Sequence, residues 1–282
     1  MIKVAKAIVK AKTTKIKMKT KATIKILAIE TASEACSAAL LISDIDNAKS
    51  DAVNRDHKQK IYLQIELTPR QHAKKILSML GKVLEQGNTE LNEVDAIAFG
   101  QGPGAFTGLR IAAGVAQGVS LSVGKPVVPV STLAALARQT IVELKNSGKK
   151  YQGEIIATAL DARMGEVYWG LFKSNEHENN KIESLCEEQV SKPQEMLINL
   201  KAMIEKDNCK ALAVGAGWDA YYDDLSQKEK LEGISHLSKL FPTASSIAEL
   251  ALSLLKDGKA VASEDAQPVY IRNDVAKKSL KQ

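Results

Sequence analysis

Aromatic residues are scarce in this sequence, at 4% of the chain, although hydrophobic residues reach 45%. The core must therefore be built mainly from Ala, Val, Ile and Leu, which is typical of helices packed on a parallel sheet. Long apolar runs are also lacking, since no stretch approaches the ~18 residues that a membrane-spanning helix needs. We therefore expect an α/β protein that does not enter a membrane.

Metal-binding and redox patterns are absent as well. The three cysteines, Cys36, Cys186 and Cys209, have no metal or redox spacing, and their odd number favours a reducing, cytoplasmic location. The four histidines are scattered and form no H-x-x-x-H pair. We expect His72 to be a surface or packing residue, and we predict no metal site.

Acidic residues are missing from the first 25 positions, which hold nine lysines. Without these lysines, 39 − 9 = 30 basic residues stand against 33 acidic ones, so the net charge of +6 becomes −3. We predict that residues 1–23 form a disordered basic extension. It is functionally silent, an RNA-binding arm, or sequence upstream of a later start such as Met18. It has no long apolar segment and is therefore not a secretory signal.

The most informative stretch is residues 94–119, which predicts a strand, a glycine loop and a helix. Residues 96–99 are apolar, as in a strand buried on both faces. Three glycines follow and allow a sharp turn with bare N–H groups, at Gly100, Gly102 and Gly104. Thr107 is expected to cap the helix, and Arg110 lies in its first turn. The loop therefore favours an anion, although an ordinary strand-to-helix crossover explains it equally well.

A hairpin precedes this stretch, with strands predicted at residues 24–29 and 36–42. Its turn is rich in hydroxyl groups, so Thr31 and its neighbours can hold a phosphate while Glu30 orients a metal-bound water. A solvated hairpin turn is the alternative interpretation. Residues 155–172 form a second strand, turn and strand that resemble the first in outline, with Asp161 at the turn. Two related hairpins predict a duplicated, two-lobed fold with a cleft between the lobes.

Spacing of apolar residues predicts the other elements. Strands are expected at residues 61–67, 127–130 and 211–218. Helices are expected from Thr68 and Pro69 to Gly87, from Thr107 to Val123, from Ser131 and Thr132 to about Leu144, and at residues 193–208 and 245–255. Residues 43–60 and 174–184 are expected to be polar loops. We divide the chain into the extension (1–23), an N-terminal lobe (24–128), a C-terminal lobe (129–243), and a C-terminal helix and tail (244–282).

Seven segments match one family in the same order: residues 26–32, 35–40, 70–72, 102–110, 131–133, 161–168 and 268–273. With these motifs the chain resembles the TsaB (YeaZ) family over residues 24–275. The resemblance implies a two-lobed fold of the actin, hexokinase and Hsp70 (ASKHA) type, with duplicated βββαβα lobes. It also implies a role in making threonylcarbamoyladenosine on tRNA, next to the anticodon.

Members of this family are non-catalytic partners of the transferase TsaD and work with the ATPase TsaE, so tRNA is met only through the complex. Alone, they form homodimers through the helices that otherwise meet TsaD. Carried over to this chain, the resemblance implies an interface on two helices, which comprises His72, Ile76, Met79, Leu80, Ile111, Gly114, Val115 and Gly118. Gly114 and Gly118 lie on one helical face and let another backbone come close.

The chain departs from the family's habit at Glu30, Ala32 and Ala105, where Asp, Ser and Ser are commoner. These changes weaken a metal or phosphate site, so we expect no catalytic residue and no required cofactor. The resemblance still allows ATP or ADP at the partner interface, held by a vestigial phosphate loop of Thr31, Gly102, Gly104, Thr107 and Arg110. Two alternatives are an ATP-dependent ASKHA enzyme that uses Glu30, Thr31 and Asp161 in the cleft, and a tRNA-binding module that uses the lysine extension.

Overall fold

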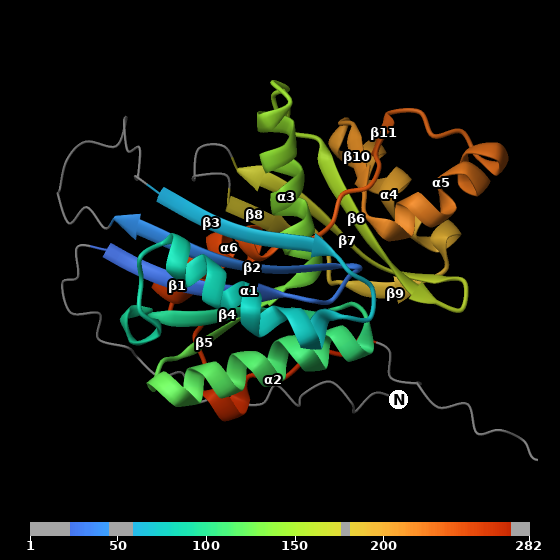
Figure 1. The fold of residues 1–282 in the computed structure, drawn as a ribbon. Coiled ribbons are helices and arrows are strands. Elements are labelled where there is room, and N and C mark those ends of the chain that lie inside the picture. The colour runs from blue at the N-terminus through green and yellow to red at the C-terminus, as the bar shows by residue number, and fades with distance from the viewer. Residues whose placement is uncertain (1–22, 45–58, 176–180, 272–282) are drawn as a thin grey trace, which may run out of the picture.

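The computed structural model describes residues 23–44, 59–175 and 181–271, which form two β-sheets with helices packed around them (Figure 1). No helix in these ranges combines the length and the apolar character needed to cross a membrane. The predicted extension, and most of the predicted loops at 43–60 and 174–184, lie outside the described residues.

The first sheet has five strands in the order β3-β2-β1-β4-β5. They are β1 (Thr23–Glu30), β2 (Ala35–Asp44), β3 (Gln59–Leu67), β4 (Ala96–Gly102) and β5 (Val127–Ser131). β1, β2 and β3 are antiparallel neighbours, whereas β1, β4 and β5 are parallel. The central strands β1 and β4 are buried on both faces because helices cover the sheet from both sides.

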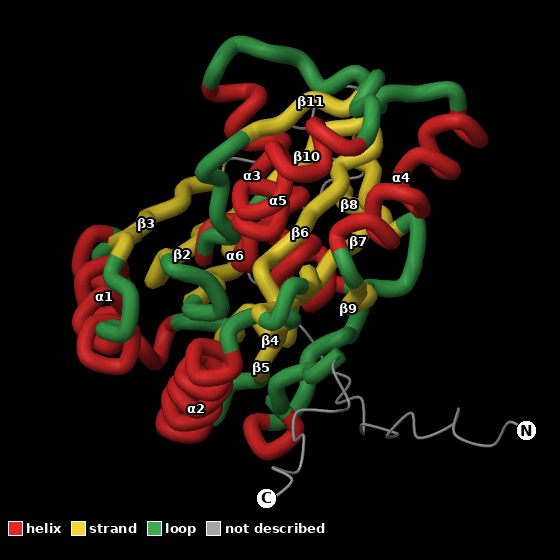
Figure 2. Tube along the Cα trace, turned by 90° about the vertical axis from the view of Figure 1, so that its right-hand side faces the viewer, coloured by secondary structure: helices red, strands yellow, loops and turns green. Residues whose placement is uncertain are grey.

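In the part of the chain that the structure describes, six α-helices surround the sheets. They are α1 (His72–Gln86), α2 (Phe106–Val123), α3 (Thr132–Asn146), α4 (Pro193–Asp207), α5 (Ala216–Lys228) and α6 (Ala244–Lys256). α1 and α2 pack on one face of the first sheet through an apolar cluster that includes Ile76 and Phe99. α6 packs on the other face, against Ile26 and Leu41. Figure 2 shows α1 and α2 next to one another on the outside of the molecule.

The second sheet repeats the first in its topology. Its strands are β6 (Ile155–Arg163), β7 (Glu166–Asn175), β8 (Lys181–Ser184), β9 (Gln189–Ser191), β10 (Ala211–Val214) and β11 (Ile234–Leu237). Read from its antiparallel edge, the order is β8-β7-β6-β10-β11, with β9 pairing β7 as an addition. In the first half three strands, and in the second half three strands and the additional β9, are followed by helix, strand, helix, strand and helix. The predicted two-lobed α/β fold with duplicated lobes is therefore confirmed.

Several predicted boundaries are wrong. α1 begins at His72 rather than Pro69, because Arg70 takes a left-handed φ of 66° that interrupts the helix. α2 begins at Phe106 with Ala105 as its N-cap, so Thr107 lies inside the first turn. The strand predicted to run to Trp218 ends at Val214, and Trp218 belongs to α5. Residues 181–184, predicted as loop, form β8.

The proposed division at residue 128 falls inside β5, because the chain leaves the first sheet only after Ser131. α6, which we placed with the C-terminal tail, packs on the first sheet and against α3. Residues 266–271 of the tail also return to the first half, where Val269 N–H donates to the carbonyl of Gln101 over 2.8 Å. The segments on either side of the second sheet thus contribute to the first half.

Candidate functional site

The glycine loop and the first hairpin turn meet at the end of the first sheet, as their sequence motifs predict. Thr31 is fully buried, and its Oγ1 donates a hydrogen bond of 2.7 Å to the carbonyl of Gly108 in α2. The N–H of Ala105 donates to the carbonyl of Ala32 over 2.8 Å. The N-terminus of α2 is therefore held directly against the turn between β1 and β2.

Glycine is required at this junction because two backbones touch. A Cβ at Gly108 would lie 1.9 Å from the carbonyl oxygen of Thr31, and one at Gly104 would lie 2.7 Å from that of Ala32. Gly102 has a φ of 115°, and a Cβ there would lie 2.8 Å from the carbonyl oxygen of Val269. The glycines therefore serve close packing of turn, helix and tail.

These contacts do not fit a phosphate cradle. The Thr31 hydroxyl donates within the fold, and the turn closes on the helix N-terminus where an anion would bind. Of the other predicted phosphate ligands, Thr107 is exposed, and Arg110 lies 3.9 Å over the ring of Phe106 and donates from Nε to the Tyr270 hydroxyl. Nucleotide binding by this chain stays a prediction.

Glu30 lies at the end of β1 and is completely buried. Its Oε1 accepts a hydrogen bond from the N–H of Ala32, and its Oε2 occupies the space that a Cβ of Gly100 would need. Burial raises the pKa of this carboxyl from 4.5 to about 7, against the opposing effect of backbone hydrogen bonds from Ala32 and Thr31. Glu30 is thus a buried group within the junction, with no water-exposed side.

Asp161, the other carboxylate considered for catalysis, lies at the turn of the second hairpin. Both of its oxygens are used locally, since they accept hydrogen bonds of 2.8 and 2.9 Å from the backbone N–H and the guanidinium of Arg163. Within the described ranges, no group of three or more His, Cys, Asp or Glu side chains is placed to hold a metal ion. His72 is buried under α1, where it packs rather than faces solvent.

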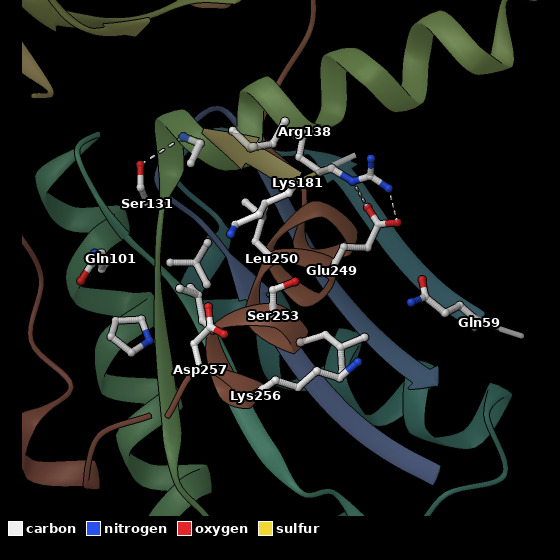
Figure 3. Close-up of a pocket in the computed structure, with 16 residues that line it drawn as sticks. Gln59, Gln101, Ser131, Arg138, Lys181, Glu249, Leu250, Ser253, Lys256 and Asp257 are labelled. Atoms are coloured by element: carbon white, nitrogen blue, oxygen red, sulfur yellow. Dashed lines mark hydrogen bonds and ion pairs between the residues drawn. The ribbon is translucent and has the colours of Figure 1, made fainter. Parts of the chain in front are cut away.

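A cavity of about 400 Å³ lies between α3, α6, β5 and the edge strand β8 (Figure 3). One wall carries Arg138, which donates from Nε and Nη2 to the carboxylate of Glu249, both over 2.9 Å. Its charged lining consists of three basic side chains and two acidic ones, namely Arg138, Lys181, Lys256, Glu249 and Asp257. Because these charges nearly cancel, the cavity offers little stabilisation to a triphosphate.

The predicted interface residues divide into two groups. The first group, on α1, is buried and packs on the side of the helix that faces the sheet, so it does not reach the outer face. It consists of His72, Ile76, Met79 and Leu80. On α2, Gly114 and Gly118 are exposed, with Ile111 and Val115 half-buried beside them. Sequence reasoning missed the residues that α1 does expose, among them Leu77 and Gly81, and it missed Leu121 on α2.

Each of these two helices exposes a row of apolar residues and glycines. The side chain of Leu77 is 60% exposed and that of Leu121 is 76% exposed. A Cβ at Gly81, Gly114 or Gly118 would meet nothing within 4 Å. We call this surface, made of Ala73, Leu77, Gly81, Gly114, Gly118 and Leu121, the α1/α2 face. The spacing of these residues, three or four apart, was the signal that could have identified it.

Comparison with known proteins assigns the fold to a family. The family model for TsaD, tRNA N6-adenosine threonylcarbamoyltransferase, matches residues 58–280. The tRNA threonylcarbamoyladenosine biosynthesis protein TsaB of Escherichia coli is 35% identical over 257 residues, which cover 91% of this chain and 98% of that protein. The chain belongs to the TsaB (YeaZ) family. The predicted ASKHA fold is confirmed with it.

Other TsaB family members are similar to the same extent. TsaB of Haemophilus influenzae is 35% identical and is covered over 96% of its length, against 90% of this chain. The solved structure of YeaZ from Pseudomonas aeruginosa is 32% identical, with a TM-score of 0.67, and covers 88% of this chain and 99% of its own. The match therefore extends over both halves of the TsaB fold.

Proposed function

We propose that this chain supports the synthesis of threonylcarbamoyladenosine on tRNA as a non-catalytic partner of a TsaD transferase. Its relatives are named biosynthesis proteins for this nucleoside. The observation that carries the proposal is the α1/α2 face, where two neighbouring helices present three glycines and two exposed leucines to solvent. Such a surface allows helices of a partner to approach closely and bury apolar side chains.

The junction supports a scaffold role rather than catalysis. Glu30 and Thr31, which an ATP-dependent enzyme would need in the cleft, are both buried and bonded inside the first half. TsaD therefore supplies the transfer chemistry in this proposal, TsaE supplies the ATPase, and the chain meets tRNA only through their complex in the cytoplasm. Without TsaD, the α1/α2 face pairs with its copy on a second chain.

The test measures the molar mass of the purified chain by light scattering, alone and with TsaD of the same organism. Wild type should shift from homodimer to heterodimer. Gly118→Trp should form neither the homodimer through the α1/α2 face nor the heterodimer, because the indole would occupy the open space above α2. Gln227→Trp, an exposed change on α5, is the matched control and should behave as wild type.

Activity provides the second measurement. Formation of threonylcarbamoyladenosine in a mixture with TsaD and TsaE should require this chain and should fall at least about tenfold with Gly118→Trp, in line with the loss of a central interface contact. The chain without TsaD should form none. A wild-type monomer that ignores TsaD would overturn the proposal.

A further inference from the structure

Among the described residues, β3 is the outer strand of the first sheet, and one of its faces is apolar and partly exposed. Its nine residues alternate, so that four apolar side chains point to the side of the sheet that α6 covers. Their exposed fractions rise along the strand, from 36% for Ile61 and 37% for Leu63 to 44% for Ile65 and 63% for Leu67. An edge of this length and composition is a template for pairing with another strand.

The corresponding edge of the second sheet is different. β8 occupies the same place in the repeated topology, but it has four residues and carries Lys181 and Glu183. A short, charged edge is a common protection against unwanted strand pairing. β3 also carries two charged side chains, Lys60 and Glu66, but with nine residues it lacks the shortness of β8, although both strands occupy the outer position of the same topology (Figure 1).

The sequence of β3 is complementary to itself when reversed. Leu63 lies at its centre, with isoleucines two residues away on each side and with Lys60 and Glu66 three residues away. In an antiparallel pair of two such strands around a two-fold axis at Leu63, Lys60 lies opposite Glu66 of the other copy, twice over. The isoleucines lie opposite one another, and Leu63 opposite itself. A shift of two residues would leave both charge pairs unmatched.

From this complementarity we propose that the β3 edge docks a second copy of this chain, which joins two five-stranded sheets across a two-fold axis centred on Leu63. Glu66 already accepts a hydrogen bond from Lys75 of α1, and its carboxylate has lone pairs for a second ammonium group. The interface is isologous, as a closed dimer requires. It does not use α2, so it does not depend on the proposed function.

Charge reversal tests the proposed register. All variants carry Gly118→Trp, which removes pairing through α2, and the dimer dissociation constant is measured by sedimentation equilibrium. Lys60→Glu alone places like charges opposite one another twice, and so does Glu66→Lys alone; each should weaken the dimer about tenfold. An equal mixture of the two variants forms heterodimers with both charge pairs restored, and its affinity should return to within about threefold of the parent.

A disulfide tests the axis itself. Leu63→Cys should cross-link two chains under mild oxidation, because the two thiols face one another. Ile61→Cys is the matched control and should not, because its opposite residue is Ile65 of the other copy. Three results would each overturn the proposal: a monomeric Gly118→Trp parent at high concentration, single charge variants that the mixture does not rescue, or cross-linking at residue 61 as fast as at residue 63.

Discussion

In each half of the molecule, the start of a helix packs against the end of a strand. We call this contact the joint, and its chemistry differs between the two halves. In the first half, Gly104 and Gly108 bring α2 onto the turn after β1; in the second, Gly217 brings α5 onto β6, where a Cβ would lie 2.8 Å from that of Ala159. In the second joint, the indole N–H of Trp218 donates to the carbonyl of Ala157. The first joint encloses a carboxyl and a hydroxyl group, from Glu30 and Thr31.

The comparison shows that backbone contact, not a bound anion, is what the repeated fold demands of its glycines. A strand-to-helix glycine turn occurs in both halves and is filled by the chain itself in both. What differs between the halves is the burial of the carboxyl group. Glu30 is completely buried, which makes the first joint sensitive to pH, whereas Asp161 in β6 is bonded to the exposed side chain of Arg163.

The largest effect is expected where the backbones are closest. Gly108→Ala should cost about 3 kcal/mol of unfolding free energy or more, because its Cβ would lie 1.9 Å from the Thr31 carbonyl oxygen. Gly217→Ala should cost about 1 to 2 kcal/mol, since its contacts begin at 2.8 Å. Gly114→Ala, with no atom within 4 Å, should stabilise the helix slightly. Urea unfolding measures all three. Equal losses of unfolding free energy for Gly108→Ala and Gly114→Ala would contradict the conclusion that Gly108 is needed for backbone contact.

Replacement of Glu30 tests whether the stability of the first joint depends on pH. Its pKa is raised in the folded state, so the folded chain holds the proton up to about pH 7, whereas the unfolded chain releases it near 4.5. Stability from this group is therefore full below pH 4.5 and is lost as the pH rises to 7. Glu30→Gln mimics the protonated form and should raise stability at pH 8 by up to about 3 kcal/mol.

The control for that change is Glu34→Gln, an exposed side chain on the same turn. Its unfolding curve should follow wild type at pH 5 and at pH 8. The gain from Glu30→Gln should shrink toward zero below pH 4.5, and a gain that is equal at both ends of the range would show that ionisation is not its cause.

A smaller effect is expected for two buried hydroxyl groups, that of Thr31 in the turn after β1 and that of Thr158 in β6. Thr31→Val removes the 2.7 Å hydrogen bond to Gly108 and leaves a buried carbonyl without it, so the loss should be about 1 to 2 kcal/mol. Thr158→Val in β6 removes a longer bond, 3.3 Å, to the carbonyl of Gly170 and should cost about half as much. Thermal unfolding can rank them, and the reverse order would mean that the hydroxyl contributes little to the first joint.

Strands and helices with a clear apolar period were predictable from sequence, as β1, β4 and the body of α2 show. Boundaries set by a single backbone angle were not. The sequence around Thr68 and Pro69 does not indicate that Arg70 adopts a positive φ. At α2, the capping preference of Thr107 was outweighed by the hydrogen bond between Ala105 and Ala32. Local preferences are worth about 1 kcal/mol, and tertiary contacts routinely exceed them.

The sequence predicted which segments meet at the site, but it did not predict what they do there. The motifs around Thr31 and Gly104 do come together, but only the distance between their backbones shows that they fill each other's space. For the helices, the apolar positions of α1 were correctly recognised, yet Ile76 and Leu80 face inward and Leu77 faces outward. When a helix has apolar residues on two faces, a single sequence does not show which face packs on the sheet.

The position of α6 has a consequence for the order of events during synthesis. This helix, encoded near the end of the chain, is the cover on one face of the first sheet, over Ile26, Ala28 and Leu41. While the ribosome is still adding residues before Ala244, that face lacks the apolar side chains of α6, even though all five strands and Ala135 of α3 have already emerged. The first half of the gene product must therefore wait for the last helix, and a nascent chain released early would expose a sheet prone to aggregation.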